Sequence, residues 1–355
     1  MLILQKYLFR EGLLASLASL VVFMVIILAL FFAEVMGDAA QGRLPASSIL
    51  LLLLLRLPEA LQMVAPLALM TGVLLTWGRL GEQSELAVMR GGGLAFSRAL
   101  LPVSGLALCW AAGLLAVSGW LAPYASERTG LMLEDAARQA LLSGLQPGRF
   151  NKMDQGRLTV YVGQVDRADG SLGDILVQFD DERYPELLTA SRGRLWIDQE
   201  DGTRYLSLFD GQQVQHASER GDSGMREIRF ERNDVRLPQP VLDGFGEETA
   251  KPLPALWPTS TAAEFRELHW RLASPIAALM LALLAVALAV RLPRQGRFGS
   301  LVLALLIYLV YSNAIHAGLL WMEQRNVHSG LGLWPLHWVL VLIMAVMLIR
   351  QWRRW

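Results

Sequence analysis

The feature that most constrains this chain is residues 12–33, a run of 22 residues without a charged side chain. A bilayer core is about 30 Å thick, so a helix needs roughly 20 apolar residues to cross it. Because hydrocarbon offers backbone groups no water, a crossing segment must be helical. Five further segments meet this requirement, which predicts a membrane protein built as an α-helical bundle of six transmembrane helices. The six segments are residues 12–33, 47–78, 99–122, 272–290, 298–320 and 333–349.

Basic residues are distributed unequally between the two ends of these segments. Eleven Lys and Arg residues lie near ends that share one side, whereas the short loops of the other side hold only Arg43 and Arg325. Since cytoplasmic loops carry the excess of Lys and Arg, both termini are predicted to be cytoplasmic and residues 123–264 to lie outside. Residues 12–33 are too long for a removable signal peptide, so we expect them to stay as an anchor.

The long polar stretch, residues 123–264, is predicted to fold separately. It carries 24 acidic and 16 basic residues, a net charge of about −8, which argues against nucleic acid as a partner. The only cysteine, Cys109, lies in the third apolar segment, so this domain folds without an intrachain disulfide. At about 140 residues it is large enough to bury a core of its own.

Apolar residues recur at every second position along several runs of this stretch, which predicts antiparallel β-strands. Asp201-Gly202 and Asp210-Gly211 fall between runs and are interpreted as hairpin turns. The apolar face has two alternative uses, an ordinary sandwich core or an incompletely closed interior that takes lipid acyl chains, and both need the same alternation. The candidate interior residues are Leu158, Val160, Val162, Ile175, Val177, Phe179, Leu206, Leu208, Ile228 and Phe230.

Sequence signatures of catalysis are missing. The cytoplasmic parts are too short for a catalytic domain, and none of the three lysines follows a glycine in a phosphate-binding loop. The five histidines show neither metal-ligand spacing nor the neighbours of a Ser-His-acid set. The chain is therefore predicted to be no enzyme and to bind neither a metal nor another cofactor itself.

Arg56, Glu59 and His316 are ionisable residues within the apolar segments. Arg56 and Glu59 are three residues apart, on one helix face where they can pair, and Pro58 between them favours a helix break. Because charge inside a bilayer is costly and usually faces the bundle interior, they form either a polar patch near a substrate cavity or a local ion pair near the interface. His316 is the only histidine deep in an apolar segment, where it serves either a proton or ligand role or as a hydrogen-bonded packing residue.

Residues 82–90 form the most informative cytoplasmic segment. Acidic side chains at its start, an arginine at its end and three following glycines predict a short helix on the inner face. Leu86 and Met89 share one side, as docking into a partner would require. Lipid-bound interfacial helices favour Lys and Arg, so two leading glutamates favour a protein partner. The predicted docking residues are Glu82, Glu85, Leu86, Met89 and Arg90.

An ordered set of residues in the second segment, in the following loop and around the fourth segment carries a family resemblance. Its members are Leu57, Pro58, Glu59, Pro66, Leu67, Gly72, Gly78, Arg79, Leu80, Ser84, Glu85, Val88, Met89, Leu268, Trp270, Arg271 and residues 293–297. With these residues the chain resembles the LptF/LptG family, the permeases of the lipopolysaccharide export ABC transporter of Gram-negative bacteria, and its LptF branch in particular. The resemblance covers essentially the whole chain.

The resemblance implies an architecture and a set of partners. Residues 1–122 would hold helices one to three with the coupling helix, 123–264 a periplasmic β-jellyroll with its linker, and 265–355 helices four to six, in the bacterial inner membrane. An LptG-like permease would form a heterodimer with this chain. An LptB-like ATPase dimer would use ATP and Mg and dock on residues 82–90, with Glu85 as the main contact. An LptC-like protein would take the lipid from the jellyroll.

The resemblance also implies a path for the lipid. Lipopolysaccharide would enter through lateral gates between helices one and five of opposite subunits and pass to the jellyroll. Arg43, Arg56, Glu59 and His316 are the candidate contacts to lipid phosphates or a polar cavity. Glu34 and Asp38 stand at the outer end of helix one, where family members often carry basic side chains, so the partner subunit is expected to supply most phosphate contacts. The alternatives are a polytopic receptor or another lipid-binding membrane protein with a periplasmic ligand domain, or an intramembrane enzyme.

Overall fold

The computed structural model describes residues 2–40, 48–132, 148–153, 158–165, 171–179, 186–197, 204–219, 222–236, 247–289, 297–325, 327, 330–353 and 355. The chain divides into two compact units. A helical unit comprises Met1–Asp38, Ala46–Gly130 and Gly244–Trp355, and a β unit lies mainly within Leu131–Asp243. Residues 123–130 and 247–264, which the sequence assigned to the outer domain, therefore pack with the helices.

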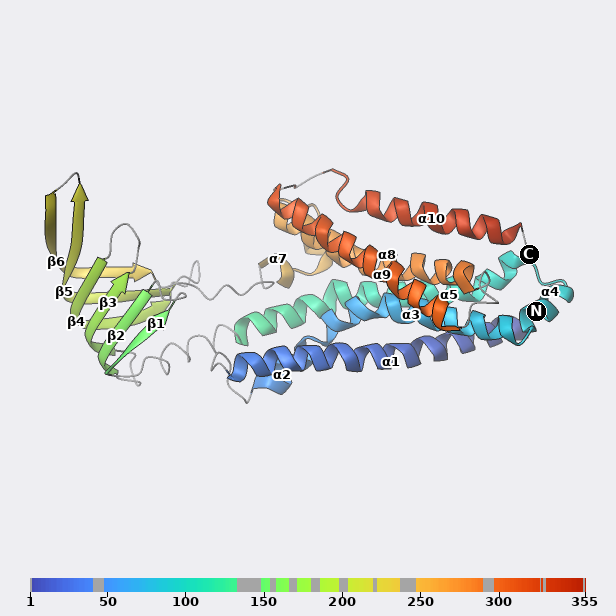
Figure 1. Cartoon of the computed structure of the whole chain (residues 1–355), viewed down its shortest axis with the longest axis horizontal. Coiled ribbons are helices and arrows are strands. Elements are labelled where there is room, and N and C mark those ends of the chain that lie inside the picture. The colour runs from blue at the N-terminus through green and yellow to red at the C-terminus, as the bar shows by residue number, and fades with distance from the viewer. Residues whose placement is uncertain are drawn as a thin grey trace. The chain divides into compact units, whose positions relative to one another are not determined.

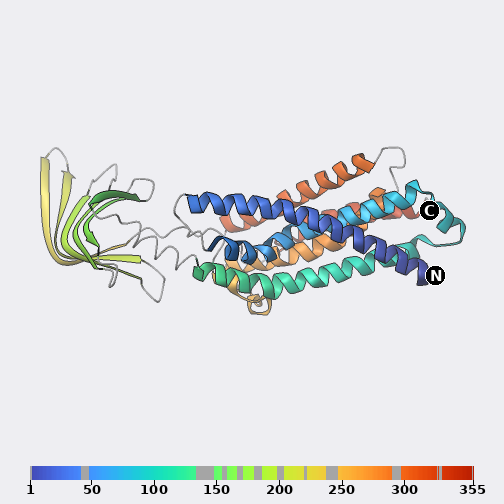
Figure 2. The ribbon, with the colours of Figure 1, turned by 90° about the horizontal axis from the view of Figure 1, so that it is seen from below.

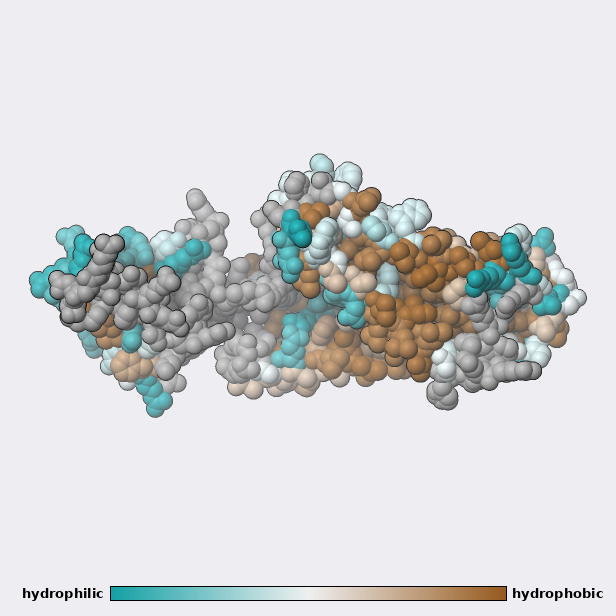
Figure 3. Space-filling model, turned by 45° about the horizontal axis from the view of Figure 1, so that its top comes forward, coloured by the Kyte–Doolittle hydropathy of each residue, from teal (hydrophilic) through white to brown (hydrophobic). Residues whose placement is uncertain are grey.

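The helical unit contains the six membrane-crossing helices that the sequence predicts. Within the described residues, six helices are long and apolar enough to cross a membrane, and Figure 3 shows apolar side chains over the middle of this unit. Its elements, drawn in Figure 1, are α1 (Leu2–Ala40), α2 (Ile49–Leu55), α3 (Leu57–Glu82), α4 (Glu85–Gly91), α5 (Phe96–Ala116), the π-helical η2 (Val117–Leu121), α7 (Glu247–Ala250), the 3-10 helix η4 (Leu253–Leu256), α8 (Ala262–Ala289), α9 (Arg297–Gln324) and α10 (Trp334–Trp352).

Helices α3 and α8 form the centre of this unit. Of the most apolar stretch of α3, 83% is buried inside the chain, against 11% for α1 and 17% for each of α9 and α10. Small residues let the central helices approach closely: Ala278, Ala282 and Ala285 of α8 are fully buried, and a Cβ on Gly72 of α3 would overlap Ser16 of α1. Helices α1, α9 and α10 thus expose apolar faces that lipid or another helix must cover.

The second apolar segment is broken where the sequence predicts. Arg56 separates α2 from α3, and Pro58 lies in the first turn of α3, where its missing N–H costs no hydrogen bond. The third segment extends further than predicted, because the helix that begins at Phe96 continues to Met132. The fourth also begins earlier, at Ala262 rather than near residue 272.

The β unit is one antiparallel sheet whose strands follow chain order from β1 to β6. A jellyroll has Greek-key crossovers, and the described strands have none, so this sheet is jellyroll-like in its curvature, visible in Figure 2, rather than in its strand order. The strands are β1 (Arg149–Met153), β2 (Leu158–Val165), β3 (Ser171–Phe179), β4 (Glu186–Ile197), β5 (Arg204–Glu219) and β6 (Asp222–Arg236).

A bend crosses the sheet at one transverse row. Asp174 and Asp210 have φ angles of 51° and 55°, and the ladders skip them and Ser191, which lies between them on β4. Aspartate is one of the few residues besides glycine that adopts this left-handed conformation. Across this row, neighbouring inward residues of one strand are three positions apart instead of two. The flanking buried pairs are Leu172 and Ile175 on β3, Ala190 and Gly193 on β4, and Leu208 and Gly211 on β5.

Two sequence predictions about the strands are therefore wrong. The period of two does not run throughout, because it slips by one residue at the bend. Asp210-Gly211 is no hairpin turn but lies inside β5, which pairs with β4 on one side and β6 on the other. Here the aspartate bends a strand instead of reversing it. Asp201-Gly202 lies outside the described residues.

A polar network joins β4, β5 and β6 beyond the bend. The indole Nε1 of Trp196 donates to Ser207 Oγ over 2.7 Å, and this hydroxyl donates to Asp234 Oδ1 over 2.5 Å. Arg232 Nε also donates to Asp234 Oδ1, over 3.0 Å. Burial raises the pKa of Asp234, but the hydrogen bonds from Arg232 and Ser207 and the charge of Arg232 together outweigh burial, so the pKa lies below its ordinary 3.8.

Candidate coupling and lipid-binding sites

The predicted helix 82–90 is divided in the structure. Glu82 ends α3, and α4 begins at Glu85 after a turn in which Ser84 has a left-handed φ of 60°. The glycines end α4 as expected: Gly92 N donates to Val88 O over 2.8 Å, and Gly93 takes a φ of 82°. The prediction of one helix from residue 82 to 90 is thus wrong, because the turn at Ser84 lets α4 change direction from α3.

The apolar side of α4 faces the chain's own helices. Leu86 is 7% exposed and belongs to the core cluster that contains Trp77 and Leu80, and Met89 packs against this cluster. These two residues share one side, as predicted, but that side is already covered. The large apolar side chain that α4 exposes is Val88, at 75% exposure. Val88 stood in the resemblance set but was not predicted as a contact.

Side-chain hydrogen bonds join α1 to α4 and to the end of α3 that precedes it. The Tyr7 hydroxyl donates to Glu85 Oε2 over 3.3 Å. One turn further along α1, Arg79 Nη2 donates to Glu11 Oε2 over 2.6 Å. Figure 1 shows both chain termini at the same end as α4, and the indole of Trp355 donates to Leu94 O over 2.9 Å. The position of α4 is therefore set by α1, α3 and the C-terminal residues jointly.

One face of the sheet carries a buried apolar cluster. Val160 and Val177 are 2% and 0% exposed. Of the ten predicted interior residues, six are buried against one another, Ile228 and Phe230 are half-buried, and the side chains of Leu158 and Phe179 lie outside the described set. The prediction missed four members of this cluster, which are Leu172, Leu188, Ala190 and Val235.

Arg56 pairs with a different carboxylate from the one predicted. Its Nη1 donates to Glu34 Oε2 over 2.7 Å and its Nη2 to Glu34 Oε1 over 3.3 Å, while the guanidinium lies 5.1 Å from the centre of the Phe31 ring. Arg56 lies at the helix break, so α1 rather than the next turn of α3 supplies its partner. The charge of Glu34, near the outer end of α1, is thus neutralised within the chain.

The remaining predicted polar residues are His316, Glu59 and Arg43. His316 is exposed on α9, where its Nδ1 is bonded to Ser312 O over 2.8 Å and its ring lies edge-on to Trp270. Glu59 is exposed on α3, and Arg43 lies outside the described residues. Glu59 lies close enough to Arg56 and Glu34 for their charges to act on it, whereas the described contacts of His316 are with Ser312 and Trp270. The role of these residues as lipid-phosphate or polar-cavity contacts stays a prediction.

The comparison with protein families decides the identity of the chain. Residues 6–350 match the family described as lipopolysaccharide export system permease LptF/LptG. The chain belongs to this family. It is therefore a multi-pass inner-membrane protein and a permease-type subunit rather than a catalytic enzyme.

Individual relatives agree with the LptF/LptG assignment. The lipopolysaccharide export system permease protein LptF of Escherichia coli (strain K12) is 28% identical over 315 residues, which cover 87% of this chain and 84% of that protein. LptF of Shigella flexneri matches to the same extent. LptG of Escherichia coli (strain K12) is 29% identical over 146 residues, 41% of this chain and 40% of that protein. The longer match confirms the predicted resemblance to the LptF branch.

Within this LptF/LptG architecture, two features escaped sequence reasoning. Arg271 was read only as part of the resemblance, yet it is buried at the start of α8 with 1% exposure. Thr261 and Glu264 form a capping box at the start of α8, in which Glu264 N donates to Thr261 Oγ1 over 3.2 Å and Thr261 N donates to Glu264 Oε2 over 3.3 Å. The Thr-x-x-Glu spacing was readable from the sequence, whereas the burial of Arg271 was not.

Proposed function

We propose that this chain is one of two permease subunits of an ABC transporter that extracts lipopolysaccharide from the outer leaflet of the inner membrane and passes it to a periplasmic protein bridge. The family match over residues 6–350 carries this proposal. The partners would be an LptG-like permease, an LptB-like ATPase dimer and an LptC-like protein. Both termini would be cytoplasmic and the β unit periplasmic.

The ATPase dimer would dock on α4 and move it during ATP hydrolysis. The chain has no sequence for nucleotide binding, so ATP and Mg would be bound by the ATPase dimer. Val88 is an exposed apolar side chain beside charged residues, a pattern typical of a small docking surface. Glu85, held by Tyr7, would lie at the edge of this surface. Because α4 follows directly on the buried helix α3, displacement of α4 would move the centre of the bundle.

The lipid would enter beside α1. This helix and α9, the first and fifth crossing helices, are with α10 the least buried of the six candidate crossing helices in the described residues. A lateral gate between α1 of one subunit and α9 of the other would use these uncovered apolar faces. The Glu34–Arg56 pair leaves no unpaired cation from these two residues, which supports the expectation that the partner subunit supplies most contacts to lipid phosphates.

The β unit would receive the acyl chains only after its core opens. Its most buried side chains already contact one another, so an acyl chain could enter there only by displacing them. Phe230 packs on the margin of this cluster and is half-buried, on β6 at the edge of the sheet. We propose that acyl chains first contact Phe230 and its neighbour Ile228.

The proposal is tested by copurification followed by reconstitution. Tagged chain should recover an ATP-binding subunit and a second six-helix permease, and this complex in proteoliposomes should release lipopolysaccharide to a soluble acceptor only with ATP and Mg. Glu85→Ala should lower recovery of the ATPase while the second permease is still recovered. A chain that recovers neither subunit, or that releases lipopolysaccharide without nucleotide, would favour a receptor or another lipid-binding protein instead.

A further inference from the structure

The least expected group in the helical unit is the guanidinium of Arg271. It is 1% exposed, in a helix whose following residues are apolar. A buried charge is costly unless it is paired and hydrogen-bonded. Arg271 meets both conditions, since its Nε donates to Glu267 Oε1 over 2.7 Å, one turn earlier on α8. The neighbouring carboxylate thus balances the charge.

The rest of the guanidinium is bonded to main chain. Nη1 donates to Lys251 O over 2.5 Å, and Nη2 donates to Thr249 O over 2.9 Å and to Glu248 O over 3.2 Å. These carbonyls lie in α7 and just after it, where the carbonyls of a helix end lack internal partners and attract a cation. Arg271 therefore fixes the path of the backbone at residues 248–251 whatever side chains they carry.

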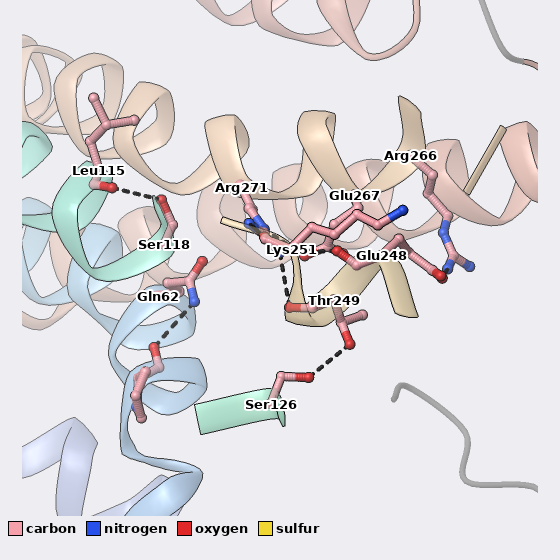
Figure 4. Close-up of polar contacts among 11 residues, drawn as sticks. Gln62, Leu115, Ser118, Ser126, Glu248, Thr249, Lys251, Arg266, Glu267 and Arg271 are labelled. Atoms are coloured by element: carbon pink, nitrogen blue, oxygen red, sulfur yellow. Dashed lines mark hydrogen bonds and ion pairs between the residues drawn. The ribbon is translucent and has the colours of Figure 1, made fainter. Parts of the chain in front are cut away.

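Side-chain contacts of the same segment join it to two further helices. Figure 4 shows Ser126 beside Thr249, with their hydroxyl oxygens 2.7 Å apart. Arg266 of α8 bonds Glu248 over 3.3 Å and Glu323 of α9 over 2.8 Å. We call Ser126, Glu248, Thr249, Lys251, Glu267 and Arg271 the junction clamp.

The junction clamp lies close in sequence to both points where the chain passes between the helical unit and the β unit. The helical unit ends at Gly130 on the way into the β unit and resumes at Gly244 on the way out. Ser126 and Thr249 thus lie a few residues inside both connections, and their contact holds the two connections together. On its other side, α8 is joined to α3 by the Ser274 hydroxyl, which donates to Gln62 O over 2.8 Å. Helix α3 leads in turn to α4.

We infer that Arg271 is a positioning residue that fixes both connections of the β unit to α8, so that movement of α3 and α8 during the transport cycle displaces the attachment points of the β unit. This inference rests on the proposed function. A buried ion pair adds little stability compared with apolar side chains of similar size, so its contribution here is the defined backbone path. Without the clamp, ATP hydrolysis would continue while less lipid would reach the β unit.

The test uses the reconstituted complex with its partner permease and ATPase. Arg271→Lys keeps the charge but loses the planar fork that reaches Glu267 and three carbonyls at once. Arg271→Met combined with Glu267→Leu removes both charges and leaves none unpaired, which guards against a folding failure of the first variant. Arg325→Lys, the same change at the exposed position directly after α9, is the matched control. Hydrogen exchange of amides 247–251, ATP hydrolysis and lipopolysaccharide released per ATP are measured for each.

Both clamp variants should exchange amides 247–251 faster by about tenfold or more. Their ATP hydrolysis should stay within about twofold of the wild type, while lipopolysaccharide released per ATP should fall by about tenfold. The control should match the wild type in all three. Unchanged exchange or unchanged release per ATP would overturn the inference.

Two further outcomes separate the inference on Arg271 from a purely structural role and from the proposed function. A parallel fall of ATP hydrolysis and release, or failure of both variants to assemble, would show a purely structural role and would overturn the inference. A wild-type complex that hydrolyses ATP but releases no lipopolysaccharide would refute the proposed function instead, and the exchange measurement would still judge whether Arg271 holds residues 247–251.

Discussion

Replacing Val88 by alanine tests the proposed coupling surface most directly. Val88 is 75% exposed, so the chain itself loses little packing when the side chain is shortened, and alanine is the better helix former. The substitution removes two methyl-sized groups, each contributing about 0.8 kcal/mol when buried. Scaled to the three quarters of the side chain that a partner could cover, the loss is about 1.2 kcal/mol, or about an eightfold weaker Kd for the ATPase.

The assay is a titration of the purified permease heterodimer with the ATPase subunit in detergent, with bound ATPase read by an optical biosensor. Val339→Ala, on α10 at 58% exposure, is the control and should leave the Kd unchanged. Leu86→Ala provides a contrast, because truncating a buried leucine costs about 2–5 kcal/mol of stability and should reduce the amount of folded chain. A Kd for Val88→Ala within twofold of the wild type would refute the reasoning that α4 docks through its exposed side.

Three further predictions concern the β unit of the full chain. Gly193→Val should destabilise the bend by about 1–3 kcal/mol, because the valine side chain would overlap the core. Gly173→Ala is the control, because the added methyl group meets only ordinary contacts. The protease resistance of the β unit should fall in the Gly193→Val variant alone. A photo-crosslinker at Phe230 should capture lipopolysaccharide more strongly than one at Val177, and stronger capture at Val177 would mean that the core is open at rest. Because the pKa of Asp234 is lowered in the folded chain, its carboxylate stabilises the fold at pH values above the ordinary carboxyl pKa, and this stabilisation is lost as the pH falls through the folded-state pKa. The melting temperature should therefore drop less between pH 6 and pH 3 in Asp234→Asn than in the wild type. Equal drops in the two proteins would contradict the hydrogen-bond network around Asp234.

The class and the element types follow from local sequence patterns alone. Six long apolar segments can only be helices in a bilayer, and each appears in the structure. Alternating residues between them predicted strands, and β2 to β6 cover the predicted runs. The break before Pro58 and the glycine stop after α4 were also predictable, because backbone chemistry at proline and glycine acts locally.

Tertiary structure decided which face meets which partner. A helical pattern shows that Leu86 and Met89 share a side, but only packing shows that this side meets the chain's own core and leaves Val88 outward. Spacing paired Arg56 with Glu59, whereas α1, which ends 16 residues earlier in the sequence, brings Glu34 closer. The slip of strand phase at Asp174 and Asp210 depends on bending of all neighbouring strands together. The burial of Arg271 likewise depends on carbonyls about 20 residues away, because long-range contacts are set by how whole elements pack and not by local periodicity.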